Sequence, residues 1–234
     1  MNTSNNPSST LIAKGLLPLA LIALVLIVSA PLSTAAVLSS DSKPYGKSYS
    51  QWSAAFWQWA LGLPTENHPF NDTPDFDVTE GQSGHVWFLA SAFGTVERTA
   101  TIPRGTALFV SMLDVEASSL EEPPFYGATE AEQREIATSF ADLIVNVSCS
   151  IDDNAVSNIG QFRVASPQYQ FTAPTPWIFG ATGGTGTSVA DGYYVMVAPL
   201  SAGQHTIHFS GAFKFSDAPG DEAPVDMTYH ITVQ

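Results

Sequence analysis

Short segments in which apolar and polar residues alternate recur along this chain, and they constrain its fold more than any other feature. The final segment is the clearest, because every second residue from 225 to 233 is apolar. A period of two residues places successive side chains on opposite faces of an extended strand. Further strand-like segments occupy residues 85–90, 95–102, 107–113, 145–151, 193–197 and 205–209. This pattern predicts a mainly β fold, namely an antiparallel β-sandwich that is jelly-roll-like.

Two accessory α-helices and several turns complete the expected domain. Capping boxes, S-x-x-Q and T-x-x-E, begin the helices predicted at residues 48–61 and 130–143. Gly62 is placed to take the left-handed conformation that ends many helices. Pro-Arg-Gly at positions 103–105 predicts a hairpin between the strands on either side of it. Six glycines and prolines in residues 173–191 predict an irregular loop there.

The amino-terminal region reads as a targeting segment. An apolar run at residues 15–30 follows a single basic residue and precedes small residues, which is the order of a secretory signal peptide. The alternative is an uncleaved membrane anchor, but a span needs about 20 apolar residues, and this run is shorter and contains Pro18. We therefore expect a signal peptide at residues 1–36, a flexible lead-in at 37–47 and a single β-rich domain at 48–234. The protein is then secreted or periplasmic, without a stable membrane span after cleavage.

Charge and cysteine content narrow the classes of partner. All 22 acidic residues and seven of the eight basic residues follow residue 36, so the exported part carries a formal charge of −15. A surface of that sign repels the phosphates of nucleic acids, which excludes them as partners. Cys149 is the only cysteine, so no intramolecular disulfide forms. Cys149 lies in a strand pattern with no basic neighbour, which favours a buried, unreactive thiol.

Three segments carry a resemblance to a protein family. They read QWSAAFWQWALGLP, GQSGHVWFL and DGYYVMVAPLSAGQHTIHFSG. The chain resembles, over residues 45–234, a family of uncharacterised exported bacterial proteins. The resemblance implies export and a shared domain. It implies no activity, cofactor or site residue.

The first predicted helix contains three tryptophans. Trp52 and Trp59 fall within one apolar arc at 100° per residue, which favours packing against the core. Trp57 lies at the edge of that arc, where a ring can be half buried and half exposed. We therefore expect Trp57 to be the ligand contact, for example as a stacking platform for a sugar ring.

Metal-ligating residue types occur in two places. Residues 66–84 form an acidic loop with four carboxylates, Asp72, Asp75, Asp77 and Glu80. Carboxylates at this density can bind Ca²⁺, although their spacing is not that of an EF-hand. His208 and His230 lie on the polar faces of two predicted strands and could hold a metal if the strands were neighbours. Solvated loop residues and ordinary surface histidines are the simpler interpretation of both.

Three functions remain open on the sequence. The first is a binding module for a carbohydrate or another small extracellular ligand. The second is a secreted hydrolase or lyase that uses carboxylates or a His/Asp metal site. For it, Asp114 and Glu116 form a candidate acid–base pair at the end of a strand. The third is a structural cell-surface protein that assembles through its aromatic helix.

Export gives the first testable prediction. Because the apolar run is followed by small residues, we expect mass spectrometry of the secreted or periplasmic protein to find a new amino terminus near Val37. A chain that keeps Met1 and sediments with membranes would contradict this prediction.

Overall fold

The domain is mainly β, with two α-helices and two sheets of five strands each. The structure, a computed structural model, describes residues 1–3, 36–71 and 77–234. Ser33–Gln234 form one compact unit. The expected signal peptide lies outside the described residues apart from its two ends. Within the described residues, no helix has the length and apolar character needed to cross a membrane.

The strands are divided between the sheets without regard to their order along the chain. Sheet A contains β1 (Val86–Leu89), β3 (Ala107–Ser118), β6 (Arg163–Ala165), β7 (Tyr169–Ala173) and β8 (Gly184–Val197). Sheet B contains β2 (Gly94–Ile102), β4 (Ile144–Ile151), β5 (Asn154–Ala155), β9 (Gly203–Lys214) and β10 (Glu222–Val233). The helices are α1 (Tyr49–Gly62) and α2 (Glu130–Ala141), and three 3₁₀ turns are η1 (Pro44–Gly46), η2 (Pro69–Asn71) and η3 (Ile159–Phe162).

Both sheets are mixed, so the expectation of purely antiparallel sheets is wrong. Sheet A runs in the order β1-β3-β8-β6, with β7 also paired to β8, and sheet B in the order β2-β10-β9-β4-β5. β1 is parallel to β3, and β2 is parallel to β10. The expected hairpin around residues 103–105 is also wrong, because β2 and β3 belong to different sheets. A turn sequence marks where the chain changes direction, but burial decides which strand becomes the partner.

The irregular loop expected at residues 173–191 is confirmed for residues 174–183 and is wrong from residue 184 onward, where the chain forms a strand. β8 begins at Gly184 and pairs with β7 and β3. Gly192 is needed for close approach, since a Cβ at that position would lie 2.3 Å from the Cβ of Asp114 on β3. The glycines here permit tight packing between strands rather than flexibility. Gly62 likewise remains inside α1, which ends at Leu63 in an extended conformation.

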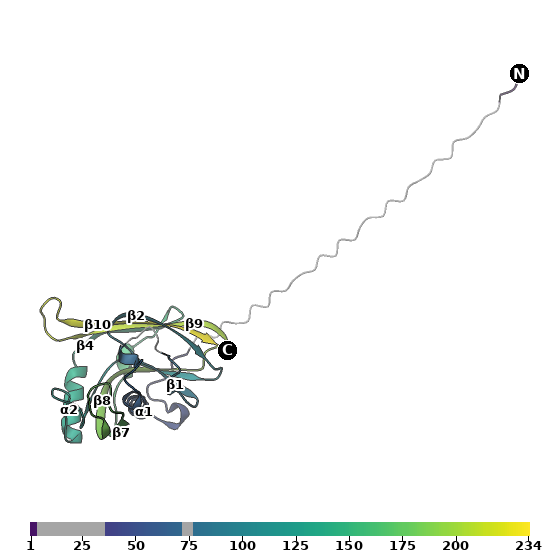
Figure 1. Ribbon diagram of the computed structural model, residues 1–234. Coiled ribbons are helices and arrows are strands. Elements are labelled where there is room, and N and C mark those ends of the chain that lie inside the picture. The colour runs from purple at the N-terminus through teal and green to yellow at the C-terminus, as the bar shows by residue number, and fades with distance from the viewer. Residues whose placement is uncertain (4–35, 72–76) are drawn as a thin grey trace. The chain divides into compact units, whose positions relative to one another are not determined.

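The two helices cover opposite faces of sheet A. Trp57 of α1 donates from its indole Nε1 to the hydroxyl of Tyr194 on β8, over 3.2 Å. Gln133 of α2 donates from Nε2 to Oγ1 of Thr187 on the same strand, over 3.0 Å. Residues seven positions apart on a strand point to opposite faces. Sheet B forms a separate layer (Figure 1), and Gly211 on β9 packs against the side chain of Leu113 on β3.

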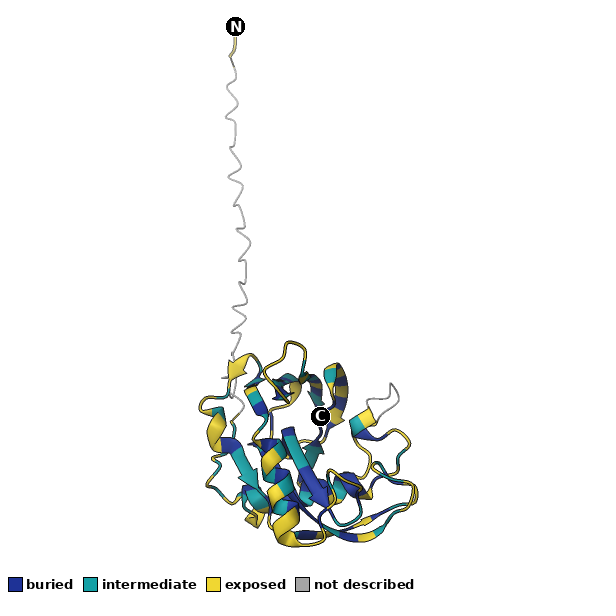
Figure 2. Ribbon diagram, turned by 90° about the vertical axis from the view of Figure 1, so that its left-hand side faces the viewer, coloured by how far each residue is buried: buried dark blue, intermediate teal, exposed yellow. Residues whose placement is uncertain are grey.

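Burial follows from this layering. Buried residues concentrate on the strands, whereas exposed ones mark the loops and the outer side of α2 (Figure 2). The segment 37–47, expected to be a flexible lead-in, is held against sheet A at its start. The backbone N–H of Leu38 donates to the carbonyl of Met196 over 2.8 Å, and Val37 forms a bridge with Val197. Cys149 is buried, and burial raises the pKa of its thiol to about 12.

The packing of α1 gives a stability prediction. Trp52 is 8% exposed, donates to the carbonyl of Pro44 over 2.9 Å, and packs against Phe88 and Phe109. Removing a buried tryptophan ring leaves a cavity, so we expect Trp52→Ala to cost about 3–5 kcal/mol in urea denaturation. Trp59 is only half buried, so Trp59→Ala should lower the free energy of unfolding by less than Trp52→Ala does. An unchanged urea midpoint for Trp52→Ala would show that α1 presents a different face to the core.

Candidate functional site

A cavity lies along the free edge of strand β3. β1 pairs with β3 only from Ala107 to Val110, so the following part of β3 has no partner from β1. The cavity has a volume of about 290 Å³, and three consecutive residues of β3 line it, which places it along the strand edge. The other walls come from β9 and β10 of sheet B, both helices, the turn η2 and several connecting loops.

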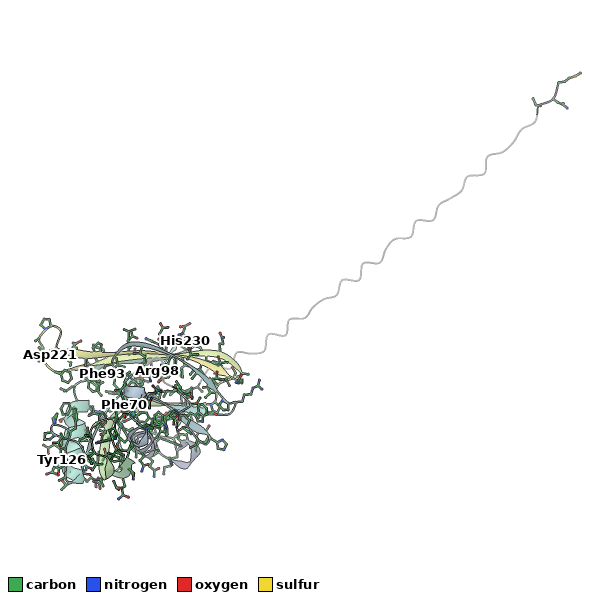
Figure 3. All side chains as sticks on the ribbon, in the orientation of Figure 1. Phe70, Phe93, Arg98, Tyr126, Asp221 and His230 are labelled. Carbon is green, nitrogen blue, oxygen red and sulfur yellow. The ribbon has the colours of Figure 1, made fainter. Side chains whose placement is uncertain are left out.

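Aromatic rings dominate the wall of this cavity. Eight of the fifteen lining residues are aromatic: Trp57, Phe70, Phe93, Phe125, Phe140, Phe179, Phe213 and Phe215. The other apolar lining residues are Ala92, Val115 and Val225. Figure 3 shows Phe70 and Phe93 on the side of sheet B that faces the rest of the domain. A wall of this kind is typical of sites that bind small molecules with an apolar body.

Three of the rings are exposed to solvent. Phe93 is 67% exposed, Phe215 is 50% exposed and Phe179 is 40% exposed. Phe93 packs against Phe213, with ring centroids 6.1 Å apart, and Phe179 stacks on Phe70 at the same distance. The exposed rings are therefore continuous with the buried ones. We call Phe93, Phe179 and Phe215 the mouth of the cavity.

Three carboxylic acids also line the cavity: Asp114, Glu116 and Glu121. Asp114 and Glu116 lie two positions apart on β3, so they share one face with their Cα atoms about 7 Å apart. Glu121 follows three residues after the strand ends. Asp114 keeps part of its surface accessible, whereas Glu116 is 3% exposed and Glu121 is 9% exposed. We call these three residues the acid cluster.

Serine hydroxyls hold one oxygen of each acid. Ser111 Oγ donates to Oδ1 of Asp114 over 2.6 Å. Ser118 donates to Oε2 of Glu121 over 3.0 Å, and Ser188 donates to Oε2 of Glu116. The second oxygens of Asp114 and Glu116 are buried and make no hydrogen bond of normal geometry to any described residue. Buried acceptors without a donor are costly, and a carboxyl in this position lowers that cost by holding a proton.

Burial changes the acidity of all three carboxyls. It raises the pKa of Asp114 to about 6, against the opposing effect of hydrogen-bond donors, Ser111 first among them. It raises the pKa of Glu121 to about 7 and that of Glu116 well above its usual range. The negative charge of Glu121 adds to the effect on Glu116, and the two carboxyls are close enough to share a proton. The acid cluster therefore gains and loses protons near neutral pH, which suits acid–base chemistry or recognition of a hydrogen-bond donor.

The structure brings together three residues that the sequence singled out separately. Asp114, Glu116 and Trp57 all line the one cavity, although whether they bind or react stays a prediction. Glu121 was missed, since only the turn after β3 returns it to the strand end. The phenylalanines of the mouth were missed as well, because they come from loops and strand ends that lie far apart in the sequence.

The expected calcium loop is only partly described. Asp72 and Asp75 lie outside the described residues. Asp77 accepts hydrogen bonds from the backbone and hydroxyl of Thr79, over 2.8 and 2.7 Å, and Glu80 is exposed. Residues 36–71 and 77–234 contain no group of three side chains placed to hold a metal ion. A Ca²⁺ site in this loop stays a prediction.

The two candidate histidines lie on neighbouring strands. His208 is opposite Thr228 in the register of β9 and β10, so it shares a face with His230 two positions further on. His208 contacts Asp226 over 2.8 Å, and His230, on the outer face of sheet B, contacts Glu97 over 3.5 Å (Figure 3). Each histidine thus has its own carboxylate, and the pair does not converge with a third ligand in the described part of the chain.

A Ser–His–Asp series occurs at the start of β9, away from the cavity. Nδ1 of His205 contacts Oδ2 of Asp152 over 2.7 Å, and Nε2 lies 3.2 Å from Oγ of Ser201. Nε2 also lies 3.0 Å from the backbone carbonyl of Ser201. The carboxylate of Asp152 and the carbonyl of Ser201 can only accept, so each ring nitrogen of His205 faces an acceptor. The arrangement holds a turn together and does not offer the free lone pair of a general base.

Comparisons with known proteins identify no family for this chain. No family model matches it, and no curated protein matches it significantly. Among solved structures, it is similar to amebosin with 11% identity and a TM-score of 0.22, over 65% of this chain and 100% of amebosin. It is similar to a cysteine protease inhibitor from Entamoeba histolytica with 11% identity and a TM-score of 0.23, over 64% and 96% of the two chains. Similarities this low carry no argument about function.

The acid cluster predicts how stability depends on pH. Glu121 has a pKa of about 7 in the folded protein and an ordinary value of 4.5, so its contribution to stability is present below pH 4.5 and is lost as pH rises through 7. We expect Glu121→Gln, which stays neutral, to be more stable than the native protein by roughly 2–3 kcal/mol at pH 8 and equally stable at pH 4. Urea denaturation at the two pH values measures this difference.

The exposed residue Glu135 supplies the control for that experiment. Glu135→Gln removes the same charge from the outer side of α2, so its effect should be small and should not change with pH. If Glu121→Gln and Glu135→Gln behave alike at both pH values, Glu121 is solvated and the acid cluster is not buried as described.

Proposed function

We propose that this protein is an exported binding protein whose small, largely apolar ligand occupies the cavity beside β3. One observation carries the proposal: exposed aromatic rings gather at the mouth of this cavity. Among the described residues of the domain, five large hydrophobic side chains are exposed, and Phe93, Phe179 and Phe215 are three of them. Soluble proteins rarely expose apolar groups together, and such patches mark binding sites.

The composition of the wall favours an apolar small molecule over a carbohydrate. A sugar presents several hydroxyls, each of which needs a polar partner once it is buried. Apart from the acid cluster, Ser91 is the only polar residue in the described part of the cavity wall. Trp57 fits this interpretation as a fixed part of the wall, because its indole N–H is already committed to Tyr194. A rigid wall lowers the entropy cost of binding.

A hydrolase or lyase is the second candidate function. It is favoured by carboxyls that hold protons near neutral pH inside a cavity, because general acid–base catalysis needs pKa values in that range. It ranks second because Asp114, Glu116 and Glu121 are held by serine hydroxyls. In addition, none of the described residues that line the cavity is basic, so none of them can stabilise a developing negative charge.

Three further expectations belong to the same proposal. The two facing sheets are best interpreted as a β-sandwich of mixed strand direction. The resemblance to exported bacterial proteins supports secretion or a periplasmic location after removal of residues 1–36. The acidic surface supports a partner that is a small extracellular molecule rather than nucleic acid.

The mouth of the cavity provides the test of binding. Naphthalene-1-methanol, a neutral molecule with an aromatic body, should bind the purified domain in isothermal titration calorimetry. Phe93→Ser and Phe215→Ser should weaken that binding about tenfold when combined, because both rings line the mouth. Stability should fall by less than about 1 kcal/mol, as is usual at exposed positions.

Tyr45 is the matched control for the mouth variant. It is 47% exposed and does not line the cavity, and its φ of 53° suits an asparagine. Tyr45→Asn should therefore leave the affinity unchanged. No binding by the native domain, or equal weakening by Tyr45→Asn and the mouth variant, would refute the proposed site.

A further inference from the structure

The polar groups of the cavity wall are all of one kind. Among the described residues, Ser91 and three carboxylic acids are the only polar ones that line the cavity, and no described lysine, arginine or histidine lines it. The wall can therefore become negative but never positive. Once the acids are ionised, a carboxylate or phosphate on a ligand would be repelled and a cation would be attracted.

Two buried oxygens of the acid cluster make no hydrogen bond of normal geometry to a described residue, namely Oε1 of Glu116 and Oδ2 of Asp114. Glu116 is only 3% exposed, so water does not replace the missing partner there. The backbone between them belongs to the free edge of β3, where the cavity lies. An N–H group of a ligand at this position would satisfy oxygens that burial has separated from water.

The aromatic walls suit a positive charge as well as an apolar body. The face of an aromatic ring is negative, so ammonium groups are attracted to it, most strongly by tryptophan. Trp57 contacts Phe70, with ring centroids 5.4 Å apart, and both rings line the cavity together with Asp114. Rings and carboxyls in one cavity are the two features that organic cations require.

We infer that the natural ligand is a hydrophobic amine, bound with its apolar body among the phenylalanine rings and its protonated nitrogen against Asp114 and Glu116. This inference rests on the proposed function, because it names the ligand class of the same cavity. Binding requires no covalent step. The amine donates N–H hydrogen bonds to the unpartnered oxygens, and its charge keeps the carboxyls ionised.

The affinity for an amine should therefore depend on pH. The titratable groups that face the acid cluster are Tyr169 of β7 and Tyr194 of β8, and burial raises the pKa of both well above the usual range. They stay neutral between pH 5 and pH 8, so in this interval the charge of the acid cluster changes through Asp114 and Glu121, whose pKa values are about 6 and about 7. Because these acids lose protons as pH rises, the affinity for a cation should rise over the same interval.

Two ligands that differ in one group test the inference. Naphthalene-1-methylamine carries an ammonium group where naphthalene-1-methanol carries a hydroxyl, and the amine stays protonated up to pH 8. We expect calorimetry on the exported domain at pH 8 to show the amine binding at least about tenfold more tightly than the alcohol. At pH 5 the preference should shrink several-fold, while the affinity for the alcohol stays constant.

Variants assign the effect to the acid cluster. Asp114→Asn should abolish the preference for the amine and leave the affinity for the alcohol within about twofold. Glu135→Gln, on the outer side of α2, should retain the full preference. If Asp114→Asn fails to fold, the pH dependence of the native domain decides the question.

The outcomes separate this inference from the proposed function. Equal binding of the amine and the alcohol, or a preference that does not change with pH, overturns the amine while leaving small-molecule binding in place. A preference that survives in Asp114→Asn overturns it as well. Binding of neither ligand overturns both the amine and the proposed function.

Discussion

Burial of three carboxyls beside one strand is the constraint on which the rest of the site depends. An ionised carboxylate loses its hydration when it is buried, and this cost is recovered only by hydrogen bonds, by an opposite charge or by protonation. The domain supplies hydroxyls from Ser111, Ser118 and Ser188, but no cation reaches the cluster from the lining residues. The remaining cost is avoided when the carboxyls are protonated, and this preference for the neutral form is what their raised pKa values express. A fold selected for stability alone would replace such a cluster with apolar side chains, so its presence argues for a use.

The architecture that creates the cluster is a difference in strand length. β1 has four residues and β3 has twelve, so β1 pairs only with the start of one edge of β3, and at the far end of β3 Ser118 bridges Tyr126. A register shift between Ser111 and Leu113 occurs just where that free edge begins. Beyond it, Gly192 leaves room for Asp114 on the neighbouring strand. The free edge, the irregularity and the glycine together explain why a cavity forms here, since bulges and strand glycines often accompany functional sites.

Features that depend on local sequence could be predicted, and features that depend on pairing could not. Both helices began where their capping boxes indicated, because Ser48 and Thr129 bond to backbone only three residues away. The prediction of a hairpin after Ile102 was wrong, because a turn sequence does not determine whether the two strands that it joins pair with each other. The strand that starts at Gly184 could not be predicted, because its glycines look like loop residues in the sequence. They are required instead by close contacts with β3 and with the turn after β3. Asp114 and Glu116 could be named as a pair, since alternation along one strand is local. Glu121 and the mouth of the cavity required the three-dimensional chain path.

Trp57 shows how one residue links the helix to the chemistry of the cavity. Its place at the edge of the apolar arc predicted a half-exposed ring, which is wrong, because Trp57 is 5% exposed, packs against Phe56 and Phe70 and donates a hydrogen bond to Tyr194. Trp57 and Tyr194 are also among the donors that lower the pKa of Asp114. A cationic ligand would favour loss of a proton from the acid cluster. It would do so next to a part of the wall that α1 holds in place through Trp57. Binding to the folded state alone would also stabilise the domain, since the cavity does not exist in the unfolded chain. The free energy of unfolding and the affinity for a ligand are therefore both linked to the protonation of the acid cluster.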